Sequence, residues 1–182
     1  MDHIQQQSRR VRILLQCLLL LLPIMVCYFW LTVNTSYDFL TTFGIVQLSF
    51  NISGFTHVPL STFTRVLALI ASLLLSGIIM RALRILIGLF RNYETGEIFS
   101  IENAKSYQKL GYSVFYWVLG TVVYRTVIGL VLSFNNPPGE RVLGITFVGV
   151  DALTLVFGLM ILIISWVMKE GHIIAEENRH TV

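Results

Sequence analysis

Two oppositely charged residues, Arg125 and Asp151, lie inside long apolar stretches of this 182-residue chain. Arg125 precedes Asn135, the start of a short polar loop, by ten residues, and Asp151 follows Arg141, the end of that loop, by ten. If both flanks are helical, the equal spacing puts the two charges at one depth, ~15 Å from the loop. An ionised group in a membrane costs at least ~3 kcal/mol unless it is paired. We therefore expect an intramembrane ion pair between Arg125 and Asp151.

This pair could serve function or structure. It could be part of a proton or ion path, or a gate that opens when the pair breaks. As a clasp, it would fix the register of two helices. Thr121, Tyr124 and Thr154 could extend the pair into a polar network, but no second intramembrane acid or histidine continues it across the membrane. This gap argues against a proton relay, and we favour the clasp.

Nothing else in the sequence indicates catalysis. The chain lacks the H-E-x-x-H spacing of a zinc site, the G-x-S-x-G pattern of a serine nucleophile and a phosphate-binding glycine loop. Its four histidines are scattered along the sequence: His3, His57, His172 and His180. We expect a protein that is not an enzyme and that holds no metal or cofactor.

The elements that must position the charges are transmembrane helices. Hydrophobic residues make up 55% of the chain and charged residues 13%, about half the charged fraction of a soluble domain. A helix needs ~20 predominantly apolar residues to cross a bilayer. Four stretches fit this requirement: 13–33, 62–83, 110–133 and 142–168. The predicted fold is an all-α integral membrane protein of one domain, with four transmembrane helices arranged as two helical hairpins.

The basic residues predict the orientation of these spans. Ten of the thirteen lysines and arginines fall on one side, and positive charge marks the cytoplasmic side of a membrane. Both termini, the inner loop 91–109 and the inner tail 169–182 are therefore expected in the cytoplasm. Three of the basic residues share one face of the second helix: Arg81, Arg84 and Arg91. We expect this basic stripe to meet water or lipid phosphate, and a docking face for an acidic segment is the alternative.

The outer loop, residues 34–61, is the largest polar feature on the other side. Apolar and polar residues alternate along 46–53, and this period of two predicts a strand in a small β-hairpin-like structure. We expect its apolar face to rest on the helix ends or on lipid headgroups. A strand edge that recruits an outside partner is the alternative.

An eight-residue pattern, G-x-I-[FI]-[SA]-x-E-N, occurs at 96–103 and again at 171–178, and we call each copy a glycine word. Each copy follows a long predicted helix, so each glycine is expected to be a left-handed C-cap. In the first word Ser can then cap a new helix that has an acidic residue in its first turn. Two such words imply two helical hairpins related by an axis along the membrane normal. The residues concerned are Gly96, Ser100, Glu102 and Asn103, and Gly171, Glu177 and Asn178.

The two words also carry a family resemblance. The inner loop reads G-E-I-F-S-I-E-N-A and the chain closes with G-H-I-I-A-E-E-N-R-H-T-V. With the four spans and the large outer loop, the sequence resembles, over essentially its full length, the bacterial membrane proteins called domain of unknown function 2975. The resemblance implies a small inner-membrane protein with no established activity, whose relatives are often encoded beside a small helix-turn-helix regulator. The family tail commonly has an acidic residue and a leucine where Arg179 and His180 stand here.

Three functions are compatible with the sequence. The first is a non-enzymatic regulatory or scaffold protein that binds a partner at its cytoplasmic face. Such a partner would be a small helix-turn-helix regulator by the resemblance alone, and we expect no direct binding of nucleic acid by this chain. The second is a transporter or channel subunit, as a homo-oligomer, built around Arg125 and Asp151. The third is an immunity-type protein that acts through its outer loop.

Overall fold

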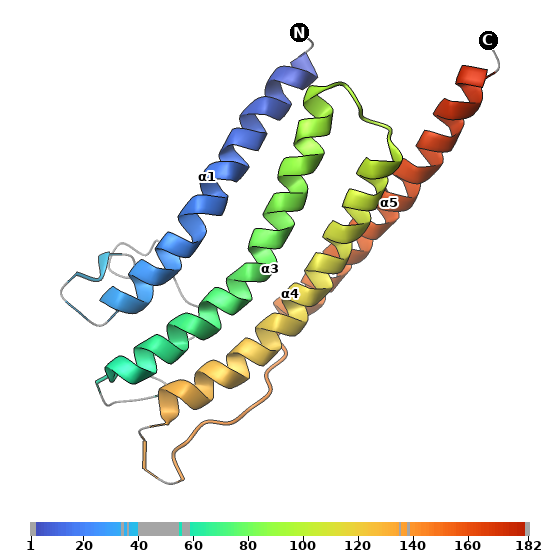
Figure 1. The fold of residues 1–182 in the computed structure, drawn as a ribbon. Coiled ribbons are helices and arrows are strands. Elements are labelled where there is room, and N and C mark those ends of the chain that lie inside the picture. Colours follow the sequence, from blue (N-terminus) through green and yellow to red (C-terminus); the bar gives the residue numbers. More distant parts are fainter. Residues whose placement is uncertain are drawn as a thin grey trace. The chain divides into compact units, whose positions relative to one another are not determined.

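The computed structural model describes residues 3–33, 35, 37–39, 55, 59–134, 136–137 and 139–180. Four long helices contain most of them (Figure 1): α1 (His3–Thr32), α3 (Thr62–Glu94), α4 (Ile101–Ser133) and α5 (Gly149–His180). Each helix is long and apolar enough to cross a membrane. These helices identify a multi-pass membrane protein, as the sequence predicts.

Each helix extends beyond its apolar stretch at one end and carries a basic residue there. The residues are Arg12 in α1, Arg84 in α3, Lys109 in α4 and Lys169 in α5. Each of these basic residues is about 20 to 24 residues from the opposite end of its helix, which is ~30–36 Å at 1.5 Å per residue. This interval is close to the ~30 Å thickness of a hydrocarbon core.

The fourth helix begins later than the sequence predicts. Residues 141–148 form an irregular segment that is neither helix nor strand, and α5 starts at Gly149 rather than near residue 142. Side chains of α4 hold this irregular segment, because Ser133 Oγ accepts a hydrogen bond from Val142 N–H (2.9 Å) and Thr126 Oγ1 donates one to the Gly144 carbonyl (3.3 Å). The premise that placed Asp151 ten helical residues from the polar loop is therefore wrong.

The chain divides into two compact units. The terminal unit contains both ends of the chain and comprises residues 1–20, 78–119 and 148–182. The loop unit contains the long loop after α1 and comprises residues 21–77 and 120–147. Each unit is described by itself.

The core of the loop unit is apolar and contains one hydrogen-bonded chain. Its buried residues are Phe29, Trp30, Val33, Ala68, Ile128 and Leu132. Trp30 Nε1 donates to Ser72 Oγ (2.7 Å), and the same oxygen is hydrogen-bonded to the Tyr124 hydroxyl (2.9 Å). Arg65 donates to the carbonyls of Trp30 (3.5 Å) and Leu31 (3.3 Å), where a cation satisfies the free end of α1. α1, α3 and α4 are thus joined by polar as well as apolar contacts.

The predicted strand of the outer loop, residues 46–53, lies outside the described residues, none of which is in a strand. Next to that loop, Ser61 is the N-cap of α3, because its Oγ accepts a hydrogen bond from Thr64 N–H (3.2 Å). α3 starts at Thr62, the residue at which the second predicted span starts. The β-hairpin-like structure stays a prediction.

Candidate functional site: the junction of the two glycine words

The first glycine word turns the chain from α3 into α4. Gly96 has φ 84, a left-handed conformation that a side chain disfavours. The N–H groups of Gly96 and Glu97 donate to the carbonyls of Tyr93 (3.2 Å) and Asn92 (3.0 Å) in the last turn of α3. This pair of bonds is a Schellman motif, so Gly96 is the C-cap that the sequence predicts.

The same word begins α4. Ser100 Oγ accepts a hydrogen bond from Asn103 N–H (3.2 Å), which makes Ser100 the N-cap of α4. Glu102 is exposed in the first turn, where the helix dipole favours a negative charge. Both residues therefore occupy the positions predicted for them.

Asn103 fastens the turn, a role that the sequence analysis did not assign. Its side chain is completely buried. Nδ2 donates to the carbonyls of Glu97 (2.6 Å) and Ile98 (3.0 Å), and Oδ1 accepts from Asn92 Nδ2 (2.8 Å). The amide thus satisfies two loop carbonyls and links α4 to α3. The sequence contains one signal for this role. Asn103 stands three residues after the capping Ser100, in the first turn of the new helix, whose backbone the cap fixes.

The second glycine word has a different structure. Residues 171–178 lie within α5, which continues to His180. The prediction that Gly171 is a helix cap is therefore wrong, as is the prediction that the chain stops and turns there. Ala175 stands where the first word has its capping serine, and Ala followed by two glutamates favours continued helix. Glu177 and Asn178 accordingly lie in the last turn of α5 rather than in the start of a new helix.

The two words contact each other in the terminal unit. A Cβ on Gly171 would lie 3.2 Å from Cδ1 of Phe99, so the missing side chain leaves room for the ring. His172 Nδ1 lies 3.3 Å from the carbonyl oxygen of Phe99. The Phe99 side chain still exposes 57% of its surface. The first word therefore holds an aromatic ring against α5 with more than half of that residue left accessible.

Small residues allow α4 and α5 to approach closely in this unit. Ser165 Oγ donates to the carbonyl of Ala104 (2.9 Å), and both residues are buried. A Cβ on Gly111 would lie only 2.5 Å from Cδ2 of Leu162, and one on Gly158 would lie 3.1 Å from Val114. Close approach at glycine, alanine and serine is typical of helix packing in membranes.

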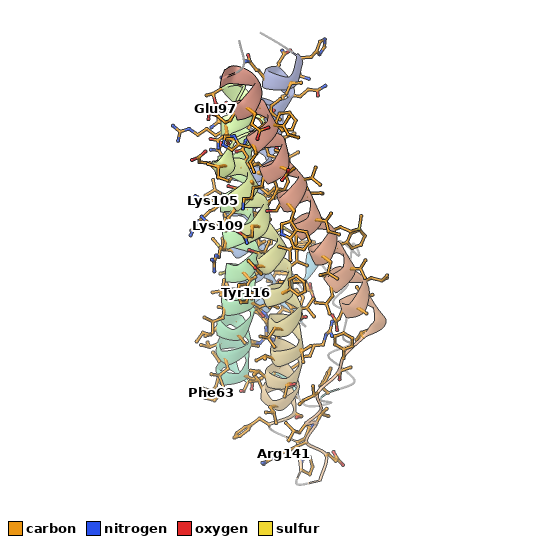
Figure 2. The ribbon with its side chains drawn as sticks, turned by 90° about the vertical axis from the view of Figure 1, so that its right-hand side faces the viewer. Phe63, Glu97, Lys105, Lys109, Tyr116 and Arg141 are labelled. Atoms are coloured by element: carbon orange, nitrogen blue, oxygen red, sulfur yellow. The ribbon has the colours of Figure 1, made fainter. Side chains whose placement is uncertain are left out.

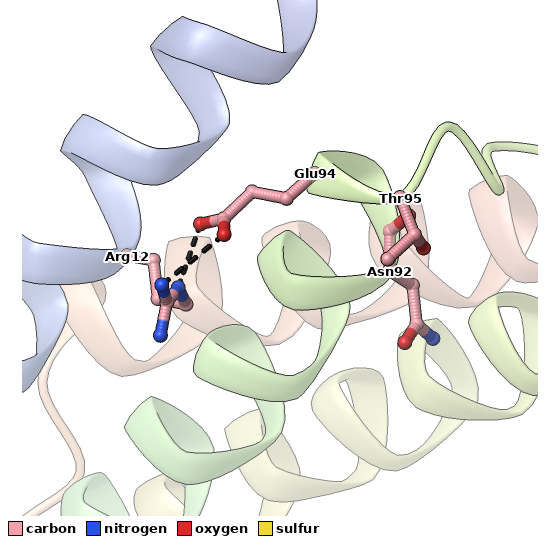
Figure 3. Close-up of polar contacts among 4 residues, drawn as sticks. All are labelled: Arg12, Asn92, Glu94 and Thr95. Atoms are coloured by element: carbon pink, nitrogen blue, oxygen red, sulfur yellow. Dashed lines mark hydrogen bonds and ion pairs between the residues drawn. The ribbon is translucent and has the colours of Figure 1, made fainter.

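An ion pair joins α1 to α3 near the first word (Figure 3). Arg12 Nε lies 2.6 Å from Oε1 of Glu94, and a second guanidinium nitrogen donates to Oε2 at 3.1 Å. Two parallel bonds fix the geometry of both side chains. Arg12 is one of the ten basic residues expected on the cytoplasmic side, and its partner stands 82 residues away in the sequence, so local spacing does not predict the pair.

Arg125 and Asp151 belong to different units, so their predicted pairing stays a prediction. Each makes a contact within its own unit. Asp151 is 4% exposed, and its Oδ2 accepts a hydrogen bond from Val148 N–H (2.9 Å) at the start of α5. A carboxylate in this position satisfies a free N–H group and faces the positive end of the helix dipole. Arg125 donates to the carbonyl of Thr146 (3.3 Å) in the irregular segment before α5.

The basic stripe of α3 is exposed along its length: Arg81, Arg84 and Arg91. Arg91 lies in the last turn of α3, where the negative end of the helix dipole favours a cation. Among the residues that the structure describes, no group of three or more His, Cys, Asp or Glu is placed to hold a metal ion.

Four helices that are long and apolar enough to cross a membrane place the chain in the class of multi-pass membrane proteins. The model of a family of proteins of unknown function, DUF2975, matches residues 50–182. The match covers more than half of the chain, which therefore belongs to this family, in agreement with the resemblance of its glycine words. No curated protein and no solved structure matches the chain.

Proposed function

We propose that this protein is a non-enzymatic scaffold or regulator that binds a protein partner through the junction surface, the exposed side chains of Glu97, Phe99 and Glu102. One observation carries the proposal: Phe99 is 57% exposed although the turn that holds it is fixed by the buried Asn103. An aromatic ring that is already ordered loses little conformational freedom on binding, and aromatic anchors dominate many interfaces.

The charges near the ring indicate the chemistry of the partner. Glu97 and Glu102 are both exposed, and they flank Phe99 in the sequence. The complementary surface is an apolar pocket with a basic rim. The excess of basic residues on this side supports a cytoplasmic location for the junction, with both termini inside. The family resemblance adds the bacterial inner membrane as the compartment and a small helix-turn-helix regulator as the kind of partner.

Capture of partners from solubilised membranes, quantified by mass spectrometry, tests the proposal. Phe99→Ala should reduce recovery of the partner by about tenfold or more, as expected for an interface anchor. Phe157→Ala is the matched control, because Phe157 is also highly exposed but lies in the apolar part of α5. Glu97→Gln combined with Glu102→Gln removes both charges, keeps the backbone bonds of the turn, and should weaken the same complex. Equal recovery with the wild type and with all these variants would remove the basis of the proposal.

The rival function is a transporter or channel built around Arg125 and Asp151. Against it, the hydrogen bond from Val148 N–H to Asp151 favours a structural role for the carboxylate. Replacing either residue alone by Leu should lower folded yield, because breaking a buried pair costs ~3–5 kcal/mol. Replacing both should restore folding if they pair. A structural pair predicts that the double variant also captures the partner, whereas a gate predicts a folded protein without function. The immunity-type role rests on the outer loop and stays a prediction.

A further inference from the structure

Five exposed side chains form a stripe on α4 within the terminal unit: Lys105, Lys109, Tyr112, Tyr116 and Leu119. Their spacings of four, three, four and three residues keep them on one face of the helix. Figure 2 shows three of them, Lys105, Lys109 and Tyr116, in this order along α4. The aromatic and aliphatic members are strongly exposed, at 49% for Tyr112, 53% for Tyr116 and 64% for Leu119.

The stripe lies on the face of α4 that the other helices of the unit leave open. Asn103 and Tyr107 face α3, since they are hydrogen-bonded to Asn92 and Tyr93 (2.8 Å each). Ala104 and Gly111 face α5, where Ser165 and Leu162 approach them. The stripe residues lie on neither of these faces, as their helical spacing requires.

The order of side chains along the stripe matches the order of groups in a phospholipid. Two cations come first, then two tyrosines, then an aliphatic residue inside the apolar part of α4. Lysine attracts anionic headgroups, tyrosine prefers the membrane interface, and leucine suits the acyl chains. A soluble protein could meet the lysines but could not follow the stripe into the hydrocarbon.

We propose that this stripe binds an anionic phospholipid. Lys105 and Lys109 stand one helical turn apart and hold the phosphate and its acidic headgroup, while Tyr116 and Leu119 pack along an acyl chain. The site lies on α4 next to the first glycine word but does not include it. Its occupant is thus a lipid and is distinct from the protein partner of the junction.

The experiment uses the purified full-length protein in detergent micelles, titrated with phosphatidylglycerol or phosphatidylcholine, with bound lipid counted by native mass spectrometry. The wild type should prefer phosphatidylglycerol. Lys105→Gln combined with Lys109→Gln should reduce that preference by at least about fivefold, the equivalent of the ~1 kcal/mol that one basic residue contributes near an anionic surface. Arg9→Gln combined with Arg10→Gln removes two exposed cations from α1 instead and should retain the preference.

Three results would overturn the site. The first is an equal preference for phosphatidylglycerol in the lysine and arginine variants. The second is displacement of the lipid by millimolar inorganic phosphate, which would assign the lysines to a soluble anion. The third is a protein dimer that persists without lipid and is lost in Tyr116→Ser, which would mean that a second copy covers the stripe. If the double lysine variant does not fold, the single variant Lys109→Gln is titrated in its place. An unchanged preference for phosphatidylglycerol in this single variant would contradict the site.

Discussion

Residues 96–103 and 171–178 share four identical residues in eight positions, yet one copy is a turn between two helices and the other is part of a single helix. In the first, a left-handed glycine ends α3 and Ser100 starts α4. In the second, Gly171 and Ala175 lie inside α5. A glycine with apolar residues two and three positions later permits a cap without enforcing one. The fifth position differs between the copies: Ser100 favours the start of a new helix, and Ala175 favours continued helix.

The difference also gives the two words complementary tasks. The first word offers an aromatic ring, and the second offers the glycine against which the ring rests. A side chain at Gly171 would push Phe99 outward, whereas a side chain at Gly96 would strain the backbone itself. The repetition therefore does not mark two equivalent hairpins; it brings together two parts of one junction. Matched substitutions at equivalent positions separate these roles.

The largest difference is expected at the eighth position of the word. Asn103→Leu removes three hydrogen bonds from a part-buried network, those to the carbonyls of Glu97 and Ile98 and to the amide of Asn92, so we expect a loss of ~3 kcal/mol. Asn178→Leu changes the last turn of a helix and should cost less than ~0.5 kcal/mol. Thermal unfolding in micelles measures both, and similar losses at the two positions would show that Asn103 has no special role.

At the first position the two glycines should respond with opposite signs. Gly96→Ala places a side chain at φ 84 and should cost about 1 kcal/mol. Gly171→Ala improves helix propensity by up to ~1 kcal/mol, and the exposed ring of Phe99 can shift by the few tenths of an ångström that its 3.2 Å contact demands. We expect this variant to be at least as stable as the wild type. A loss at Gly171→Ala equal to that at Gly96→Ala would contradict the assignment.

A smaller contrast is expected at the fifth position. Ser100→Ala removes the side-chain acceptor for Asn103 N–H and should destabilise the protein by about 1 kcal/mol. Ala175→Ser adds a hydroxyl at an exposed helical position and should cost only a few tenths, about 0.5 kcal/mol at most. Denaturation curves in mixed micelles distinguish these values when both variants are measured beside the wild type. The cap assignment fails if the serine can be removed without cost.

The sequence predicts those parts of the fold that depend on local chemistry. Apolar length predicts four helices, and the glycine and serine of the first word predict its caps. It does not predict the start of α5, because Ser133 and Thr126, which hold the irregular segment before it, act from another helix. The same limit applies to Asn103 and to the contact of Phe99 with Gly171, which depend on how the turn folds onto α3 and α5.

The asymmetry of the two words is tested most directly by the backbone conformation of their glycines. Chemical shifts of the isotopically labelled protein in micelles or bilayers report φ at both positions by NMR. We predict a positive φ, near the 84° of the structure, at Gly96 and a negative, helical φ at Gly171. A positive φ at both glycines would restore two equivalent caps, and a helical φ at both would remove the turn that presents Phe99.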